Sequence, residues 1–438
     1  MNKQKKIFSF LLVIYWIFLW ASINTIPNDI VNFGKSFTES INAIRIFIAL
    51  TLSVLIILYF FFIFFFREIK ITKINIFFFL FFTSQVLGVY LNEERNFDIH
   101  NLYLAILAIG TVCLFMFLDY FRINYLTKYL LLIALFFLSI ALIFFVSLKF
   151  NEIKNFNFYV AFQNHETNSF NQVNPRITGL SRMLALINLF IILYFFSFKN
   201  FYLRKFIIFF ATIVSIILFF MESRGTLICY FLSLTYIILF LLNKNIKSRI
   251  KYFLLLVILP ASLYFFINSN SYQIKNQESK KNEITNSNNR ILSFSSSGRY
   301  EIYSYTFKNY DYKKIFGYGS NGDRYFLKNF GKKNKYGDNT SNIFLYSLVS
   351  GGFIAMLFII LIFYEILKIF IQNQRKIQNQ TEKNGQNFIY IKFSITCLIF
   401  FFIRSFFENS FGLFSVDFLM TYLSITYIII WTNKSKIL

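Results

Sequence analysis

Three arginines, Arg176, Arg224 and Arg299, lie in polar stretches at the borders of long apolar segments. A guanidinium group is always charged, and its planar fork of donors matches the oxygens of a phosphate group. Beside Arg224, Gly225 would let a substrate approach the backbone closely. A helix beginning near Thr226 would add its positive N-terminal end. These residue types predict that the arginines bind the phosphate group of an anionic substrate.

Each arginine also has a structural explanation. Arg224 could reach the membrane interface with its charge in water, paired with Glu222. Arg176 and Arg299 could be solvated loop residues. We favour phosphate binding for some of them, because several arginines on one side of a membrane can converge on one ligand.

Acidic side chains are the candidates for proton transfer: Glu222, Glu301, Asp338, Glu408 and Asp417. Asp338 could accept a proton from an acceptor hydroxyl, although an ordinary exposed loop acid would occupy a similar position. Asp417 lies in an apolar segment, where an ionisable group indicates function, unless it forms a hydrogen bond between helices. Glu408 follows Arg404 by four residues, a spacing that predicts an ion pair on one helical turn.

The composition predicts that these residues sit on a helical membrane scaffold. Of 438 residues, 57% are hydrophobic and 65 are Phe. Long stretches such as Ile46–Phe66 and Ile207–Phe220 carry no charge. A bilayer core requires about 20 apolar residues per helix, and a chain inside it must satisfy its backbone within helices or a closed barrel. The apolar stretches lack the alternation of barrel strands, so we predict an all-α, polytopic membrane protein.

We predict twelve spans and treat the chain as a single integral membrane domain, residues 1–438. The predicted spans are residues 7–26, 46–66, 73–91, 101–118, 127–148, 183–198, 203–220, 226–242, 250–267, 342–367, 389–404 and 411–431. Basic residues concentrate in the loops on one side of this arrangement, as in Lys244–Lys251, whereas the short loops on the other side hold few. Because cytoplasmic loops carry an excess of Lys and Arg, both termini are predicted to be cytoplasmic.

Residues 268–341 form one large loop on the outer, periplasmic side. The loop has 13 Lys or Arg and 6 Asp or Glu. Long loops are exempt from the charge bias, and a basic surface indicates an anionic partner. We predict a short helix near the membrane surface from Gly298 to Phe307, then turns at residues 317–319 and 320–322.

Other function classes fit poorly. The net charge of +24 would suggest nucleic acid in a soluble protein, but here the membrane charge bias explains it. Cys113, Cys229 and Cys397 all fall in apolar segments and favour small buried side chains over a disulfide or metal site. The two histidines, His100 and His165, lack paired-ligand spacing, so we expect no zinc and no other cofactor.

Several short motifs follow one another along the chain in an order that resembles the O-antigen ligase and O-antigen (Wzy-type) polymerase superfamily. They begin with Arg176-Ile-Thr-Gly179-Leu before a span and Ser223-Arg224-Gly225 at the start of another. Ser297-Gly298-Arg299 and Gly317-Tyr-Gly319 follow in the large loop, and Ser341-Asn342, with Gly351-Gly352 further on, begins the next span. The resemblance covers about residues 170–410.

This resemblance implies a fold similar to GT-C-like membrane glycosyltransferases, without metal ion or cofactor. Its implied substrates are a glycan donor linked to undecaprenyl or another polyprenyl diphosphate and a glycan or lipid acceptor. Arg224 and Arg299, with Arg176, would hold the diphosphate, and Gly225, Ser341 and Asn342 would contribute to substrate binding. The acceptor hydroxyl would attack the anomeric carbon at the outer face of the cytoplasmic membrane. Membrane lipids and a chain-length regulator are the other implied partners.

One departure favours a polymerase over a ligase. Ligases of this superfamily usually have a His-Asn pair where this chain has Ser341-Asn342, and serine is a poor general base. Asp338, with Glu222 as a second acidic candidate, or a group on the substrate would then take the proton. A ligase remains one alternative. A flippase for the same lipid-linked glycan is another, but a transporter should show related halves and polar residues at mid-membrane depth, whereas here the polar residues gather at the outer face.

Overall fold

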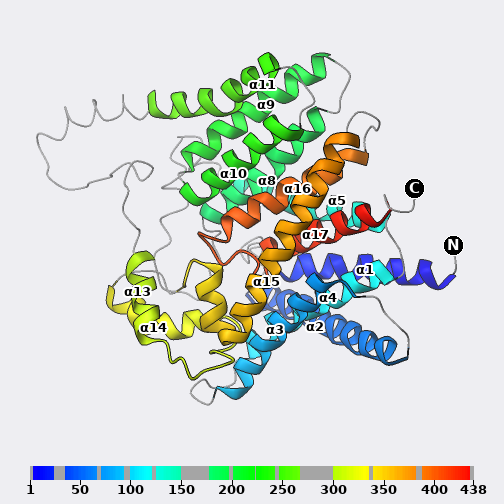
Figure 1. Cartoon of the computed structure of the whole chain (residues 1–438), viewed down its shortest axis with the longest axis vertical. Helices are drawn as coiled ribbons and strands as arrows, with labels where there is room; N and C mark the ends of the chain where they lie inside the picture. Colours follow the sequence, from blue (N-terminus) through cyan, green and yellow to red (C-terminus); the bar gives the residue numbers. More distant parts are fainter. Residues whose placement is uncertain are drawn as a thin grey trace, which may run out of the picture. The chain divides into compact units, whose positions relative to one another are not determined.

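The computed structural model of the chain consists of helices and connecting turns (Figure 1). It describes residues 3–23, 35–66, 71–92, 99–120, 125–148, 177–196, 201–221, 223–241, 246–266, 299–334, 339–380 and 387–434. No β-strand occurs in these ranges. The all-α prediction is therefore confirmed for the described part of the chain.

The chain divides into two compact units. Unit 1 comprises Met1–Phe137, Ser296–Lys376 and Phe401–Leu438, and unit 2 comprises Leu138–Ser295 and Ile377–Phe400. Unit 1 contains α1 (Lys3–Ser22), α2 (Lys35–Phe66), α3 (Lys73–Leu91), α4 (Ile99–Tyr120), α13 (Arg299–Asn309), α14 (Gly322–Asn334) and α17 (Val416–Lys434). Unit 2 contains α8 (Ile177–Phe195), α9 (Phe201–Phe220), α10 (Arg224–Tyr236) and α11 (Ile246–Phe253). Three helices contribute residues to both units: α5 (Leu126–Leu148), α15 (Ile343–Gln380) and α16 (Asn387–Arg404).

Six of the described helices are long and apolar enough to cross a membrane, and five shorter apolar helices accompany them. Only 22% of the most apolar 18-residue stretch of α2 is buried, and Phe47 and Phe65 are exposed. Exposed apolar surface of this extent, on helices long enough to cross a bilayer, is typical of a surface that faces lipid. The chain is therefore a helical membrane protein. Each of the twelve predicted spans overlaps an observed helix, while their number as membrane crossings stays a prediction.

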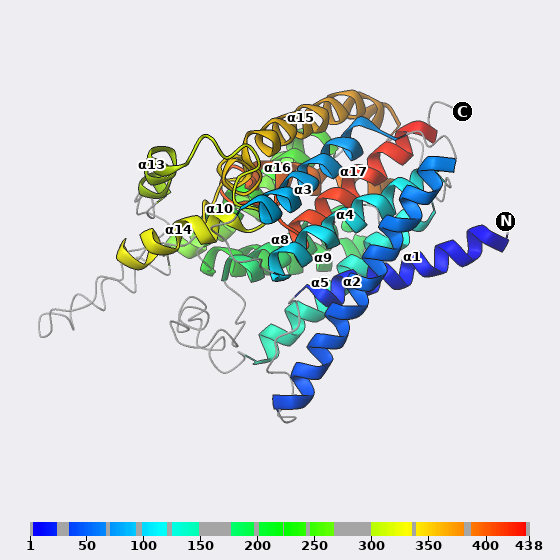
Figure 2. The same ribbon diagram turned by 90° about the horizontal axis from the view of Figure 1, so that it is seen from below.

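Aromatic side chains fill the core of unit 1 where α3, α4 and α17 lie side by side (Figure 2). The Phe78 ring lies 5.0 Å from that of Tyr422, and the Phe82 ring lies 5.0 Å from that of Phe418, both edge to face. Phe115 of α4 packs on Tyr422 at 5.2 Å. Edge-to-face contacts add stability beyond the burial of their area. The Phe-rich composition thus explains how these helices pack.

The turn after α13 docks into a break in α15. Gly352 has a φ of 69°, which interrupts the helical backbone, and the N–H of Tyr318 donates to the carbonyl of Val349 at 2.8 Å. Gly317 has a φ of 62°, and a Cβ there would come within 2.5 Å of the Val349 oxygen. Only glycine adopts this backbone at no steric cost. The predicted turn is confirmed, and its glycines attach α13 and α14 to the membrane helix.

A buried polar cluster joins three helices of unit 2. Asn188 of α8 donates to Tyr230 Oη of α10 at 2.8 Å and to Ser215 Oγ of α9 at 3.3 Å. The Ser215 and Tyr230 hydroxyls lie 2.7 Å apart. Buried polar groups gain stability only when they are paired. This cluster fixes α10, whose first residue is Arg224, against α8 and α9.

The last helix begins later than predicted. The predicted span starts at residue 411, whereas α17 starts at Val416 and residues 411–415 form turns. Ser415 precedes the helix, and its hydroxyl accepts a hydrogen bond from the N–H of Phe418 at 3.4 Å. A serine in this position satisfies a free N–H of the first helical turn. The apolar character of residues 411–414 therefore concealed a capped helix start.

Candidate functional site

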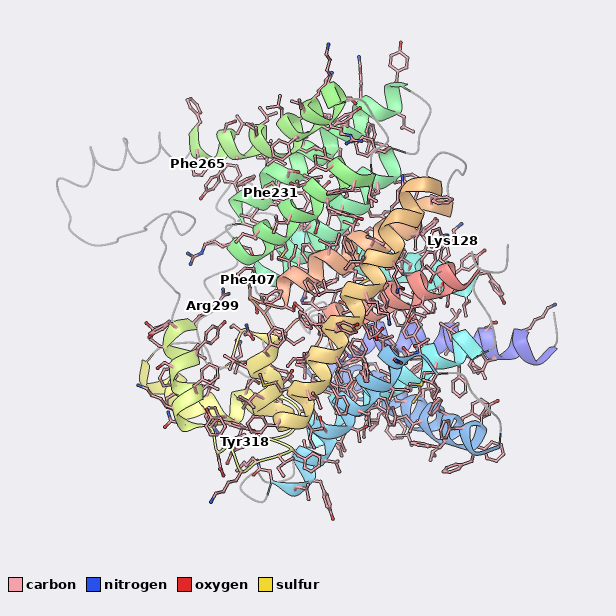
Figure 3. The ribbon with its side chains drawn as sticks, in the orientation of Figure 1. Lys128, Phe231, Phe265, Arg299, Tyr318 and Phe407 are labelled. Atoms are coloured by element: carbon pink, nitrogen blue, oxygen red, sulfur yellow. The ribbon has the colours of Figure 1, made fainter. Side chains whose placement is uncertain are left out.

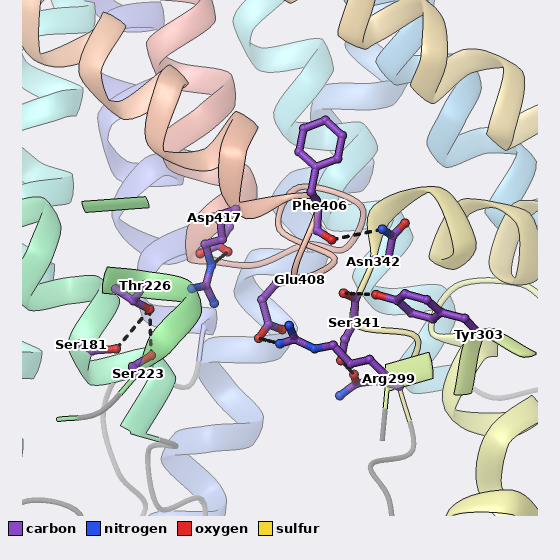
Figure 4. Close-up of polar contacts among 12 residues, drawn as sticks. Ser181, Ser223, Thr226, Arg299, Tyr303, Ser341, Asn342, Phe406, Glu408 and Asp417 are labelled. Atoms are coloured by element: carbon purple, nitrogen blue, oxygen red, sulfur yellow. Dashed lines mark hydrogen bonds and ion pairs between the residues drawn. The ribbon is translucent and has the colours of Figure 1, made fainter. Parts of the chain in front are cut away.

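Arg299 is the first residue of α13, and its side chain faces the turn after α16 (Figures 3 and 4). Its Nη2 atom lies 3.8 Å from Oε1 of Glu408. The two side chains are 33% and 27% exposed, so both can reach solvent. The first turn of a helix also presents free N–H groups that favour anions. Arg299 is thus placed where an anionic ligand could approach it.

Tyr303 lies one helical turn after Arg299 and connects α13 to the Ser341-Asn342 pair (Figure 4). Its hydroxyl donates to the Ser341 carbonyl at 3.5 Å. Burial raises the pKa of Tyr303, and Glu408 acts in the same direction, while Arg299 and a hydrogen bond with Asn342 oppose the change. The phenol is therefore kept neutral and serves as a hydrogen-bond donor.

Ser341 and Asn342 shape the start of α15. Ser341 has a φ of 45°, which is uncommon for a residue with a side chain, and its hydroxyl donates to the side chain of Asn339. The Asn342 side-chain oxygen accepts from the N–H groups of Phe344 at 2.9 Å and Leu345 at 3.3 Å. Asn342 is therefore the N-cap of α15.

A buried carboxylate holds the segment before Ser341 in place. Asp323, in the first turn of α14, is 1% exposed. Its Oδ2 atom accepts hydrogen bonds from the backbone N–H of Thr340 at 3.1 Å and from its hydroxyl at 3.2 Å. Burial raises the pKa of Asp323, although these bonds oppose the change. The carboxylate ties α14 to residues 339–342.

A buried ion pair closes the segment that carries Glu408. Arg404 Nε, at the end of α16, lies 3.1 Å from Oδ2 of Asp417 in α17 (Figure 4). Between them, the carbonyl of Phe406 accepts a hydrogen bond from Asn342 Nδ2 at 3.1 Å. The structural explanation of Asp417, a bond between two helices, is confirmed. The ion pair predicted between Arg404 and Glu408 stays a prediction, and the structure gives each side chain an ionic partner on another element.

In unit 2, α10 starts at Arg224, two residues before the predicted position. The hydroxyls of Ser181 and Ser223 donate to Thr226 Oγ1 at 3.2 Å and 3.0 Å (Figure 4). These bonds tie the first turn of α10 to α8. Arg224 and the half-buried Gly225 therefore lie in the first turn of a helix, where free N–H groups favour anions.

The predicted site residues divide into three groups. Unit 1 brings together Arg299, Ser341 and Asn342, and unit 2 contains Arg224 and Gly225. The remaining three lie outside the described residues: Arg176, Glu222 and Asp338.

Sequence reasoning missed two residues of this site. Tyr303 follows Arg299 by four residues, which places both on one face of α13, and this spacing could have indicated its position. Asp323 gave a weaker signal. It is an acidic residue directly after a predicted turn, a position typical of helix starts.

Comparison with known proteins identifies part of the chain. Residues 209–360 match the family model described as O-antigen ligase. This range includes Arg224, Arg299 and the Ser341-Asn342 pair. No curated protein and no solved structure matched. The match supports a membrane enzyme of glycosyl transfer, of ligase or polymerase type, with a lipid-linked glycan and an acceptor as substrates. This match supports the resemblance of the chain to the O-antigen ligase and polymerase superfamily.

Proposed function

We propose that this protein is a polymerase that joins polyprenyl-diphosphate-linked oligosaccharide repeats at the outer face of the cytoplasmic membrane. The observation that carries the proposal is the position of Arg299. It lies at the N-terminus of α13, is partly exposed and faces Glu408 in the turn after α16. The family match covers this arginine.

In the proposed reaction, Arg224 and Arg299 bind the diphosphate of the donor, with Arg176 as a third cation. The acceptor hydroxyl attacks the anomeric carbon, and the bond from that carbon to the diphosphate oxygen breaks. Negative charge then grows on the departing oxygen. Cations and helix N-termini that are already in place stabilise this charge without reorganisation. Arg224 and Arg299 each combine a guanidinium with the first turn of a helix.

The proposed topology has twelve spans, both termini in the cytoplasm and residues 268–341 outside. Apolar surfaces of the spans would accommodate the polyprenyl tail. The exposed side chains of α2 illustrate how apolar the lipid-facing surface is. Gly225 would allow close approach of the donor, and the Ser341-Asn342 pair would lie beside the acceptor. Asp338 and Glu222 are proton acceptors proposed from the sequence.

The second candidate is a ligase that transfers finished glycan to a lipid or protein acceptor. It is favoured by the family description, O-antigen ligase. The residue at position 341 favours the polymerase, since a serine hydroxyl is a poor general base and this one donates to the side chain of Asn339.

The two candidates can be separated with one synthetic polyprenyl-diphosphate oligosaccharide and the purified chain in lipid nanodiscs. A ladder of longer lipid-linked glycans supports the polymerase. Transfer to an added lipid core, without a ladder, identifies a ligase. A third arm uses vesicles. Movement of the lipid across the vesicle membrane, without any glycan product, contradicts both and identifies a transporter.

A further inference from the structure

Glu408 is held at a defined place although its side chain is partly exposed. Its backbone N–H donates to the Arg404 carbonyl at 2.9 Å. The buried ion pair between Arg404 and Asp417 fixes the two ends of its segment, and Asn342 binds the carbonyl of Phe406. The side chain is 27% exposed. The backbone thus positions a solvent-accessible carboxylate.

The two ion pairs of this region differ in geometry and burial. The Arg404–Asp417 pair is 3.1 Å long and its side chains are 6% and 3% exposed, as a structural pair requires. The Arg299–Glu408 pair is 3.8 Å long and far more exposed. This distance exceeds the 2.7–3.2 Å typical of a hydrogen bond, and exposed ion pairs add little to stability. The Glu408 carboxylate therefore keeps the capacity to accept a hydrogen bond from a ligand.

Glu408 also has suitable neighbours for chemistry at a diphosphate. Arg299 pairs with the carboxylate and is the first residue of α13, so its positive charge reduces the repulsion between Glu408 and an anion bound at that N-terminus. Tyr303 lies close enough for its titration to respond to both Arg299 and Glu408. A cation, a neutral donor and a carboxylate therefore meet at one exposed place. General acid–base catalysis in glycoside chemistry commonly uses such a carboxylate.

We infer that Glu408 is a catalytic residue that accepts the proton of the acceptor hydroxyl, an inference that rests on the proposed glycosyl transfer. The acceptor oxygen forms its bond to the anomeric carbon as its proton passes to the Glu408 carboxylate. The bond between the anomeric carbon and the diphosphate oxygen breaks, and its electron pair leaves with the diphosphate, beside Arg299. No further reactant is required.

Position 408 lies beyond the matched range, residues 209–360. This glutamate is therefore assigned from its geometry in this chain alone. Among the described acidic residues it is distinguished by its ion pair with Arg299. Asp323 is buried in hydrogen bonds with Thr340, and Asp417 is buried against Arg404.

The test compares two nucleophiles in nanodiscs that contain the full chain. A sugar acceptor must lose a proton, whereas azide attacks the donor as an anion and needs no base. Glu408→Gln removes the carboxylate but keeps the shape of the side chain, and Glu408→Asp keeps a carboxylate. Glu365→Gln is the control, because Glu365 forms an ion pair of 3.7 Å with Lys368 on α15.

In Glu408→Gln we expect transfer to the sugar to fall by about 10²–10⁴-fold in kcat, the usual contribution of a general base, with the KM of the donor little changed. Formation of the glycosyl azide should persist at the wild-type rate. Glu408→Asp should retain part of the sugar transfer, and Glu365→Gln all of it. The acidic limb of the wild-type pH profile should be absent from the residual activity of Glu408→Gln. The charged and ionisable neighbours are Arg299, Tyr303, Arg404 and Asp417. The arginines and the tyrosine do not titrate in acid, and Asp417 is present in both proteins.

Two outcomes overturn the inference while the proposed function stands. In one, Glu408→Gln transfers to the sugar acceptor within a few fold of wild type. In the other, it loses sugar and azide transfer equally while its thermal unfolding is unchanged, which makes Glu408 a positioning residue for Arg299. A wild-type protein that transfers to neither nucleophile refutes the proposed function and the inference with it.

Discussion

The buried carboxylate of Asp323 accepts hydrogen bonds from both the backbone N–H and the hydroxyl of Thr340. This relationship joins α14, a helix of the large polar segment, to the residues that begin α15. Ser341 and Asn342 follow directly. The position of the candidate site therefore depends on a carboxylate that is itself too buried to meet a substrate.

Replacing Asp323 with Asn should destabilise the protein. The amide keeps one acceptor but brings an NH₂ group into a place where Thr340 already donates. An unsatisfied buried polar group costs about 1–3 kcal/mol. Thermal unfolding in detergent, followed by intrinsic fluorescence, measures this. Asp311→Asn is the control, because Asp311 is exposed and its side chain accepts a local hydrogen bond from the N–H of Lys313 at 3.0 Å. Equal unfolding temperatures for the two variants would contradict the proposed role.

Comparing wild type with Asp323→Asn also gives a prediction about how stability depends on pH. Burial raises the pKa of Asp323 above its value in the unfolded chain. The folded state then binds this proton more tightly than the unfolded state, so the contribution is present below the unfolded pKa and is lost as pH rises through the folded pKa. The stability difference between wild type and Asp323→Asn should therefore be larger in acid than at neutral pH. A difference that shrinks in acid would show that the hydrogen bonds from Thr340 outweigh burial.

Gly352→Ala should weaken the docking of the turn after α13. Gly352 has φ 69° and ψ −164°, a conformation that costs a residue with a Cβ about 1–3 kcal/mol, and the added methyl would also collide with the Ile315 carbonyl. We expect a lower unfolding temperature and faster proteolysis near the turn. Gly179→Ala should instead raise the unfolding temperature slightly. Its methyl would lie 3.9 Å from Arg182 Nη2, an ordinary contact, and alanine favours a helix. Equal effects at both positions would contradict the docking.

The Arg404–Asp417 pair gives a prediction about two variants and their combination. Removing one partner of a buried ion pair leaves an unpaired charge and typically costs about 3–5 kcal/mol. Arg404→Met and Asp417→Leu should each destabilise the chain, whereas the double variant should be more stable than either one. Additive losses, measured by thermal unfolding, would show that the pair is not coupled.

Much of the helical scaffold could be predicted, because segments of about 20 apolar residues have few alternatives in a membrane. The turns at Gly317 and Gly319 were also predictable, since glycine marks positive φ. The docking of that turn onto the break at Gly352 was not, because no local pattern indicates which distant backbone a turn will contact.

The ionic partners at the site were predicted less well for a similar reason. The spacing of Arg404 and Glu408 indicated a local pair, but the structure gives Glu408 a partner on α13 and Arg404 a partner on α17. Arg299 on α13 and Glu408 in the turn after α16 are far apart from each other in the sequence. Helical spacing identifies neighbours within one helix only.

The most direct test of the account compares Arg299→Ala with Lys308→Ala in the assay for glycan polymerisation. Both variants remove one positive charge from α13, but Lys308 is exposed at the other end of the helix. If Arg299 stabilises the departing diphosphate, Arg299→Ala should lower the rate of ladder formation by about 10²–10³-fold, while Lys308→Ala stays near wild type. Equal rates in the two variants, with a ladder in both, would contradict the assignment of Arg299 to the donor diphosphate.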